Sequence, residues 1–267
     1  MWQIWTSSPF ESLEKTLGTV ERHQDLFFYE SHSSHIESLR SEFAKSGSFL
    51  VKKENHLPKA VFFDMDATLV AEESIVELAR NANKAEKVAE ITEKAMNGEL
   101  DFDQALKERV ALLKGLDQKV LDHVRSCLTI FPGVSEFVAR AHDLKIPCHV
   151  VTGGFEEIAN PLLLPLGFSS VRANRLELQG GRLTGNLVGS SFNSQGKKNR
   201  LREVAFSMGI DLNDTAAIGD GANDIPMLNE AGFALAYNPK PLLVAHASGV
   251  NRTGNHLFWL QTLLYRK

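Results

Sequence analysis

The stretch AVFFDMD (residues 60–66) decides the fold. Four consecutive apolar residues are typical of a short strand that is buried on both faces of a parallel sheet. The apolar run ends in two carboxylates, Asp64 and Asp66, at the carboxyl end of the predicted strand. Open parallel sheets bind their ligands at that end. The pair is therefore a candidate functional site, although two such residues alone fit a solvated turn or a helix cap equally well.

Two further apolar runs end in the same way. The run CHVV (148–151) is followed by TGG (152–154), and the run TAAI (215–218) is followed by GDGAND (219–224). The carboxyl ends of neighbouring parallel strands lie along one edge of a sheet. We therefore expect the three polar segments to form one shared site.

The second acidic pair, Asp220 and Asp224, implies a cation at this site. Two carboxylates 4 Å apart repel each other by about 4 kcal/mol at an effective dielectric of roughly 20. Such a cluster is tolerable only if a cation occupies it. Ligation by a few protein oxygens suits Mg²⁺, which takes its other ligands from water and substrate phosphate.

Two other features are suited to binding an anion. Thr152 and the glycines after it offer a hydroxyl and unobstructed backbone N–H groups just before a predicted helix, an arrangement that can bind an anion. Alone, this segment would be better explained as a simple turn between a strand and a helix. The other polar segments at the same sheet edge favour the anion site. Lys197 and Lys198 follow Gly196, and either could be an ordinary surface charge. A cation at the site would let an anionic nucleophile approach an anionic phosphate.

Together these segments resemble the four ordered motifs of the haloacid dehalogenase superfamily: DMDATL (64–69), TGG (152–154), Lys197 and GDGAND (219–224). The similarity extends from about residue 60 to about residue 247 and is closest to the phosphoserine phosphatases. The run MNGELDF (96–102), continuing to Arg109, is typical of that subfamily. Ala67 and Thr152 stand where many relatives have serine, and neither change removes a required catalytic group.

The resemblance implies an α/β fold, with a Rossmann-like parallel sheet core and a helical cap inserted after the first core strand. The expected domains are an N-terminal α/β extension (1–57), a catalytic core (58–72 and 133–267) and the cap (73–132). Gly180-Gly181 predicts a hairpin within 176–183.

The extension itself carries no chemical motif. Its pattern predicts strands at 2–6, 26–29 and 49–51 and helices at 10–23 and 34–44. We interpret it as a packing or dimerisation element and leave a homodimer open. It is too short and too different to be an ACT regulatory domain.

The family mechanism can be placed on these positions residue by residue. Asp64 would attack phosphorus and form an aspartyl phosphate, and Asp66 would protonate the leaving oxygen and then activate water. Asp64, the backbone carbonyl of Asp66 and Asp220 would hold Mg²⁺. The resemblance implies further that the substrate is bound by Thr152, Gly153, Lys197 and Asn223, with Asp224 orienting the metal shell or the lysine.

The cap helix carries an independent clue to the substrate. At 100° per residue, Phe102, Leu106, Val110 and Leu113 share one stripe, and Arg109 lies near its middle. A guanidinium there needs an anionic partner. Periodicity alone leaves a structural carboxylate and a substrate carboxylate equally open.

The resemblance favours a substrate carboxylate as the partner of Arg109. Glu73 is the matching position for the substrate ammonium, although an acidic residue at a helix start is also ordinary. Met96 and Phe102 would form an apolar wall around a small substrate, or equally the ordinary core of the cap.

These expectations describe a phosphoserine phosphatase that makes L-serine from O-phospho-L-serine in the last step of serine biosynthesis. The nearest alternative is a phosphatase or phosphotransferase of the same family acting on another phosphorylated amino acid or amine. A substrate without a carboxylate, such as phosphoethanolamine, would give Arg109 nothing to bind. A third alternative is a metal-binding interaction module without activity. Such a module would not need all four motifs, so their presence counts against it.

Composition limits the setting in which the chain works. Its 267 residues are 43% hydrophobic and 23% charged, and 29 basic against 33 acidic side chains leave a net charge of −4, which argues against nucleic-acid and anionic-membrane partners. No apolar run is long enough to cross a bilayer, and no secretory signal pattern is present. Cys127 and Cys148 sit in apolar contexts and fit a reducing compartment, so we expect a cytoplasmic enzyme.

Overall fold

The structure is a computed structural model. It describes residues 2–7, 20–23, 26–31, 47–53, 55–96 and 100–265. Within this part of the chain, most strands belong to one ten-stranded sheet, in the order β2-β3-β1-β4-β12-β11-β10-β5-β6-β7, and β8 and β9 form a separate pair. The strands are β1 Trp2–Thr6, β2 Val20–His23, β3 Leu26–Ser31, β4 Phe49–Lys53, β5 Ala60–Phe63, β6 Cys148–Phe155, β7 Ser170–Asn174, β8 Leu176–Gln179, β9 Arg182–Leu187, β10 Thr215–Gly219, β11 Phe233–Tyr237 and β12 Gly249–Asn251.

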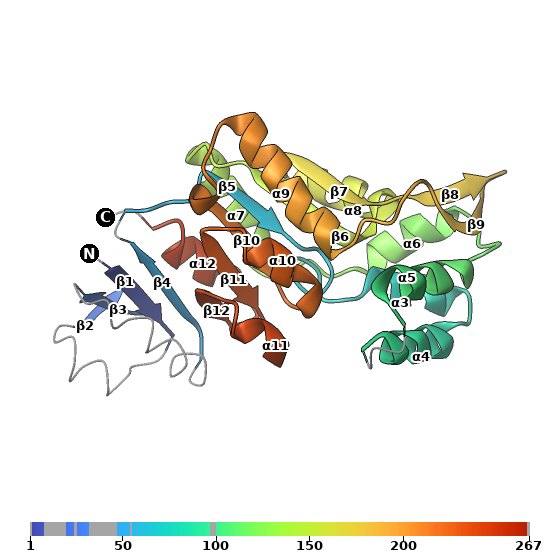
Figure 1. The fold of residues 1–267 in the computed structure, drawn as a ribbon, viewed down its shortest axis with the longest axis horizontal. Helices are drawn as coiled ribbons and strands as arrows, with labels where there is room; N and C mark the ends of the chain where they lie inside the picture. Colours follow the sequence, from blue (N-terminus) through green and yellow to red (C-terminus); the bar gives the residue numbers. More distant parts are fainter. Residues whose placement is uncertain are drawn as a thin grey trace.

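The helices form the cap and the two layers that cover the sheet (Figure 1). The α-helices are α3 Ser74–Asn81, α4 Ala85–Met96, α5 Phe102–Ala111, α6 Lys119–Cys127, α7 Val134–Asp143, α8 Glu156–Leu163, α9 Ser194–Met208, α10 Ile225–Leu228, α11 Pro241–Val244 and α12 Leu257–Thr262. The 3₁₀ turns are η1 Leu164–Leu166, η2 Leu212–Asp214 and η3 Ala222–Asp224.

The centre of the sheet is parallel, as predicted. β5 lies between β10 and β6, and both pairings are parallel. The predicted strand at 215–218 extends by one residue, whereas the predicted strand at 148–151 is four residues longer, because β6 continues to Phe155 with a register shift after Val151. The TGG segment is therefore the irregular end of a strand rather than the loop after it.

Both faces of the central sheet are buried, which explains the unbroken apolar run of β5. Val61 and Phe63 belong to a core cluster that includes α7, α8 and α12. Ala60 and Phe62 belong to a second cluster, which includes α9, α10 and α11. Alternate residues of a strand point to opposite faces, so helices on both sides require apolar residues at every position.

The cap consists of α3 to α6 and lies at one end of the molecule, beyond the carboxyl ends of the central strands (Figure 1). Helix α4 ends at Met96 and α5 begins at Phe102. Helix α5 begins where the Asp101 side chain accepts the backbone N–H of Gln104 at 2.8 Å, as an N-cap residue should.

The predicted hairpin at 176–183 is confirmed by β8 and β9, which turn through Gly180 and Gly181 at positive φ. The hairpin is hydrogen-bonded to the cap, because the Gly115 N–H donates to the Leu183 carbonyl at 2.8 Å. A second bond joins the Gln118 N–H to the Gly181 carbonyl at 2.9 Å. This piece of core sequence is thus attached to the cap.

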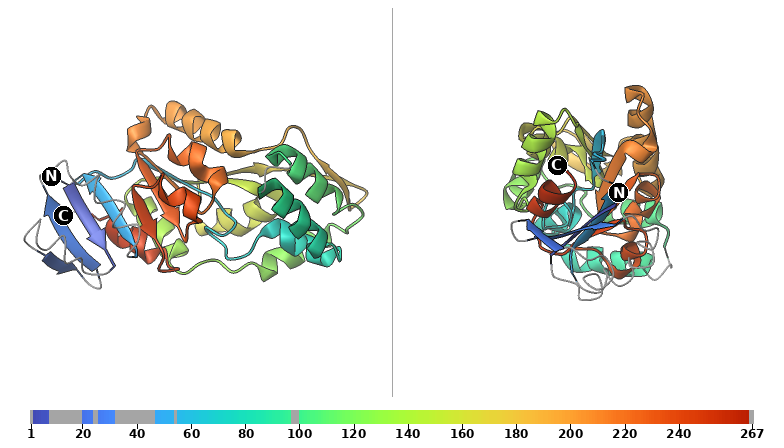
Figure 2. Two further views of the ribbon diagram at one scale, coloured as in Figure 1. Left: turned by 60° about the horizontal axis from the view of Figure 1, so that its bottom comes forward. Right: turned by 90° about the vertical axis from the view of Figure 1, so that its left-hand side faces the viewer.

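The N-terminal extension continues the central sheet, at the end opposite the cap (Figure 2). The three predicted strands are confirmed as β1, β3 and β4, and β4 pairs antiparallel with β12. The predicted helix at 10–23 is wrong for Val20–His23, which form β2 beside β3. Residues 10–19 and the helix predicted at 34–44 lie outside the described residues.

A buried lysine ties the extension to the core. Lys52 of β4 donates from Nζ to the carbonyls of Leu263 and Tyr265, at 3.1 and 2.9 Å, just beyond α12. Burial lowers the pKa of Lys52 to about 7.

None of the described helices combines the length and the apolar character that a membrane span requires.

Candidate active site

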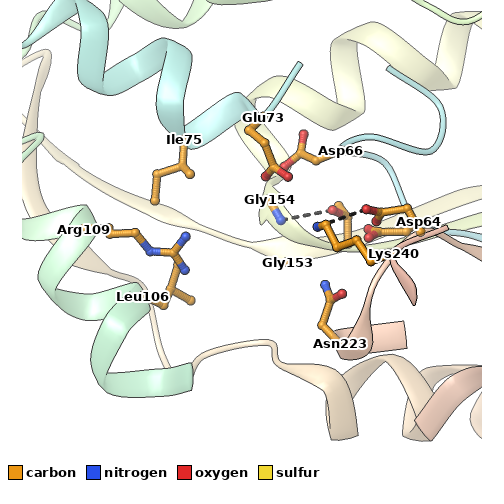
Figure 3. Close-up of a pocket in the computed structure, with 12 residues that line it drawn as sticks. Asp64, Asp66, Glu73, Ile75, Leu106, Arg109, Gly153, Gly154, Asn223 and Lys240 are labelled. Carbon is orange, nitrogen blue, oxygen red and sulfur yellow. Dashed lines mark hydrogen bonds and ion pairs between the residues drawn. The ribbon is translucent and has the colours of Figure 1, made fainter. Parts of the chain in front are cut away.

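A small cavity of about 110 Å³ opens between the core and the cap. It lies at the carboxyl ends of β5, β6 and β10, so the shared edge predicted from three separated segments is confirmed. Arg109 points into the cavity from the cap, opposite the Asp64 side (Figure 3). The lining residues are Asp64, Asp66, Glu73, Ile75, Leu106, Arg109, Thr152, Gly153, Gly154, Asp220, Asn223 and Lys240.

Asp64 is held at the end of β5 by two contacts. Its Oδ1 accepts the backbone N–H of Met65 at 2.7 Å, and its Oδ2 lies 2.8 Å from Nζ of Lys197. Both contacts fix the direction of the carboxylate. Asp64 therefore presents an oriented carboxylate to the cavity, as a nucleophile requires.

Lys197 is buried in the first turn of α9, with a side chain only 1% exposed. Its Nζ contacts Asp64 and, at 2.7 Å, Oδ1 of Asp224. Burial lowers the pKa of Lys197, but the charges of Asp224 and Asp64 outweigh burial and raise it. Lys198 instead pairs with Glu230, at 2.9 Å. The structure thus brings Lys197, and not Lys198, to Asp64.

Asp224 holds Lys197 and the backbone of the GDG turn in place through hydrogen bonds. Its Oδ2 accepts the backbone N–H groups of Asp220 and Gly221, at 3.1 and 3.2 Å. A Cβ on Gly219 would lie 2.3 Å from Cγ of Asp224, so this position has room only for glycine. With both oxygens engaged, Asp224 positions Lys197 and the backbone of the GDG turn.

The carboxylates meet the requirements of a hard divalent cation. Oxygens of Asp64, Asp220 and Asp224 lie within 4.8 Å of one another. Burial and the charge of Asp64 raise the pKa of Asp220, and Lys240 opposes this shift. Asp64 and Asp220 line the cavity and Asp224 does not, so Asp64 and Asp220 are the carboxylates available to a cation there. An all-oxygen donor set of this kind suits Mg²⁺.

Asp66 lies beside Asp64 in a different environment. Ser74 donates to its two oxygens, from the backbone N–H at 3.3 Å and from Oγ at 2.9 Å. Burial and the negative charges of Glu73 and Asp64 raise the pKa of Asp66 well above its usual range, although the Ser74 bonds oppose the shift. A carboxyl that keeps its proton is suited to act as a general acid.

The TGG segment approaches the carboxylates closely. Oγ1 of Thr152 accepts the Gly154 N–H at 3.0 Å, and the Gly153 carbonyl accepts from Asn174 at 2.9 Å. A Cβ on Gly154 would lie 3.3 Å from Oδ2 of Asp66, which explains the glycine there. Thr152 and Gly153 therefore line the cavity beside Asp66.

The cap contributes a cation that has no ionic partner among the described residues. Arg109 donates from Nε to the Ala105 carbonyl of its own helix at 3.2 Å. Burial lowers the pKa of Arg109, and the charges of Glu73 and Asp66 oppose this. A guanidinium remains protonated throughout the physiological range. Arg109 therefore places a positive charge in the cavity that an anionic ligand could pair with.

The described part of the cavity has an apolar wall. Ile75 and Leu106 line the cavity. The side chains of Met96 and Phe102 lie outside the described part of the structure, so their predicted contact stays a prediction. Asn223, in the turn η3, does reach the cavity as expected.

Sequence reasoning missed two polar residues of the site, Ser74 and Lys240. Lys240 follows β11, and its Nζ lies 3.1 Å from Oδ2 of Asp220. The strand-end argument applied to residues 233–237 would have pointed to it. No comparable signal marks Ser74, because a serine that begins a helix is common.

The comparisons with known proteins agree with this geometry. The family model described as haloacid dehalogenase-like hydrolase matches residues 61–229. A phosphoserine phosphatase of Streptomyces coelicolor is 42% identical over 78% of this chain, which spans half the length of that relative. A phosphoserine phosphatase of Streptococcus thermophilus is 42% identical over 69% of this chain and 86% of its own.

A solved structure supports the same assignment. It is described as a phospho-aspartyl intermediate analogue of phosphoserine phosphatase, with a TM-score of 0.72 and 36% identity, and it covers 79% of this chain and 100% of its own. The order of the motifs, the cap and the relatives agree. The chain belongs to the haloacid dehalogenase-like hydrolases and, within them, to the phosphoserine phosphatase family.

Proposed function

We propose that this chain is a Mg²⁺-dependent phosphatase that hydrolyses O-phospho-L-serine to L-serine and phosphate. The observation that carries the proposal is the position of Arg109. Its guanidinium faces the Asp64 side across a cavity of about 110 Å³, without an ion pair among the described residues. A small substrate with a phosphate at one end and a carboxylate at the other would satisfy both sides.

Asp64 is the proposed nucleophile. Its carboxylate oxygen forms a bond to phosphorus while the bond from phosphorus to the serine oxygen breaks, which leaves an aspartyl phosphate. Asp66 donates its proton to the departing serine oxygen and later removes a proton from the water that attacks the aspartyl phosphate. Asp64 is then regenerated, and inorganic phosphate leaves.

The phosphoryl group needs positive charge and hydrogen-bond donors around it. Lys197 is held beside the attacking oxygen by Asp64 and Asp224. Thr152, the Gly153 backbone and Asn223 line the same cavity and supply donors. Bound Mg²⁺ would supply electrostatic stabilisation of the charge on phosphorus oxygens, and Asp64, Asp220 and the backbone carbonyl of Asp66 are the residues that would hold it.

Substrate selection belongs to the cap in this proposal. Arg109 binds the serine carboxylate, which a planar guanidinium can grip with two parallel hydrogen bonds. Glu73, at the start of α3, receives the substrate ammonium. In this proposal residues 73–132 act as the specificity domain, and residues 58–72 and 133–267 act as the catalytic core. The reaction would be the step of serine biosynthesis that releases L-serine.

The alternatives fit the site less well. Phosphoethanolamine has no carboxylate and would leave Arg109 without its partner. A binding module without activity has no need of Lys197 and Asp224 to position a nucleophile, whereas here Asp64, Lys197 and Asp224 form one chain of contacts. A homodimer and a packing or dimerisation role for residues 1–57 stay predictions.

Phosphate release from a panel of substrates tests the proposal. The purified full chain is incubated with Mg²⁺ and O-phospho-L-serine, phosphothreonine, phosphoethanolamine or p-nitrophenyl phosphate. We expect the highest kcat/KM for O-phospho-L-serine, loss of activity with EDTA and recovery with added Mg²⁺. A kcat/KM for phosphoethanolamine equal to that for phosphoserine would overturn the proposed selectivity, and full activity in EDTA would overturn the metal role.

A further inference from the structure

Lys240 combines an anchored backbone with a solvent-exposed side chain. Its backbone N–H donates to the Asp220 carbonyl at 2.9 Å, which anchors the start of α11 to the GDG turn. Its Nζ returns to the same residue and lies 3.1 Å from Oδ2 of Asp220. A Cβ on Gly221 would lie 3.5 Å from this Nζ, so the ammonium sits over the turn. The side chain is nevertheless 58% exposed.

The three cations of the site are held very differently. Lys197 is buried and makes two ion pairs, and Arg109 makes none among the described residues. Lys240 lines the cavity and makes one ion pair among the described residues, with Asp220. The Asp220 side of this pair is buried, at 8% exposed, but the ammonium is in contact with solvent, which screens the attraction and keeps its net stability modest. Of the three cations, Lys240 can therefore leave its partner most easily.

Asp220 cannot serve an ammonium and a divalent cation equally well. In the proposed function its carboxylate is a Mg²⁺ ligand, and Lys240 holds an oxygen of that carboxylate. We propose that Lys240 is a built-in counter-cation of the metal site, which neutralises Asp220 while the metal is absent and leaves this carboxylate when Mg²⁺ binds. This inference rests on the proposed function in so far as Asp220 is the metal ligand.

Two consequences follow from this competition. Lys240 relieves the repulsion between Asp220 and Asp64, so the metal-free fold tolerates its acidic cluster. It also weakens Mg²⁺ binding, because the metal must displace an ammonium that is tethered beside its ligand. The affinity for Mg²⁺ is thus set by a residue that is not itself a ligand.

Calorimetric titration of the full chain with Mg²⁺ tests the inference without relying on activity. We expect Lys240→Met to bind Mg²⁺ about two- to fivefold more tightly than the wild type, which is the value of one solvent-screened ion pair. Lys240→Arg, which keeps the charge, should stay close to the wild type. In EDTA, Lys240→Met should also unfold at a lower temperature than the wild type, and saturating Mg²⁺ should remove that difference.

Lys59→Met is the matched control. Lys59 pairs with Asp214 at 2.7 Å, and its side chain is 60% exposed, close to the value for Lys240. It precedes β5, about 16 Å along the strand from Asp64, which exceeds the Debye length of about 8 Å at physiological ionic strength. This variant removes the same charge, and we expect its Mg²⁺ affinity to be unchanged.

The outcomes separate this inference from the proposed function. Equal Mg²⁺ affinities for the wild type and Lys240→Met, weaker binding by Lys240→Met, or an equal gain in Lys59→Met would each overturn the role of Lys240 while the phosphatase stands. A wild type that binds no Mg²⁺ would overturn the proposed function, and the inference with it.

Discussion

The two ends of the cavity are built on different principles. At the phosphate end, Asp64, Lys197 and Asp224 satisfy one another through contacts of 2.7–2.8 Å. At the cap end, Arg109 bonds only to a carbonyl of its own helix, among the residues that the structure describes. The charged groups at the first end are paired with one another before substrate binds, whereas Arg109 at the second end has no ionic partner among the described residues.

This difference separates chemistry from selection. Groups at the phosphate end are preorganised by strand ends and by each other, which is what electrostatic stabilisation of a reacting phosphoryl group needs. In the proposed function the unpaired charge of Arg109 would discriminate, because a substrate without a carboxylate would leave it uncompensated. Changes at the phosphate end should therefore affect every substrate, whereas changes at the cap end should affect only substrates that carry a carboxylate.

The largest effect is expected for Asp64→Asn. The amide cannot form the aspartyl phosphate, so kcat should fall by about 10⁴-fold or more on both O-phosphoserine and p-nitrophenyl phosphate. Steady-state kinetics measure the loss, and circular dichroism confirms that the variant is folded. Near-normal turnover of either substrate would eliminate Asp64 as the nucleophile.

Arg109→Ala should separate the two ends. Removal of a charged hydrogen bond to the carboxylate should lower kcat/KM for O-phosphoserine by about 100-fold, with little change for p-nitrophenyl phosphate. Lys107→Ala is the control, because Lys107 is an exposed cation on the same helix and does not line the cavity. Equal losses on both substrates would assign Arg109 a structural role.

Ser74→Ala should shift a pH profile rather than abolish activity. The two bonds from Ser74 stabilise the ionised form of Asp66 and lower its pKa, and the variant loses the hydroxyl bond. The pKa of Asp66 should then rise further, because one of the interactions that opposes its upward shift is lost. Because the acid form donates the proton, the alkaline limb of kcat should move to higher pH. A shift to lower pH would contradict this role of Ser74.

The smallest effect is expected for Asp103→Ala, which removes a contact between the cap and the catalytic core. Nδ2 of Asn193 donates to Oδ1 of Asp103 on α5 at 3.1 Å, while its Oδ1 caps the helix that carries Lys197. Asp103→Ala should raise KM for O-phosphoserine by about two- to fivefold and leave kcat nearly unchanged. Asp103→Asn, which keeps an acceptor, should restore KM. A fall in kcat without a change in KM would show that the contact serves Lys197 rather than cap docking.

The phosphate end was largely predictable from the sequence. Three of its four motifs, DMDATL, TGG and GDGAND, follow or end a run of apolar residues that only a doubly covered strand requires. Parallel topology then places those strand ends together, so local pattern and topology suffice for Asp64, Thr152 and Asp220. The roles assigned to these residues stay predictions until the variants are measured.

The extension was harder to predict because strand and helix patterns are ambiguous in short segments. Val20–His23 read as the end of a helix, but pairing with β3 makes them a strand. Nothing local indicates that β4 would continue the core sheet beside β12, or that β8 and β9 would attach to the cap. Those contacts join segments that are distant along the chain.

By itself, the sequence determined the central parallel strands, the helical cap and the order of the acidic, glycine-rich and lysine motifs, because each depends on periodicity or on residues that are close in the chain. Only the tertiary structure decided that Lys197 rather than Lys198 meets Asp64, that Ser74 holds Asp66, and that Lys240 covers Asp220. These choices depend on the direction of individual side chains across distant elements. Packing sets that direction, and no local pattern encodes it.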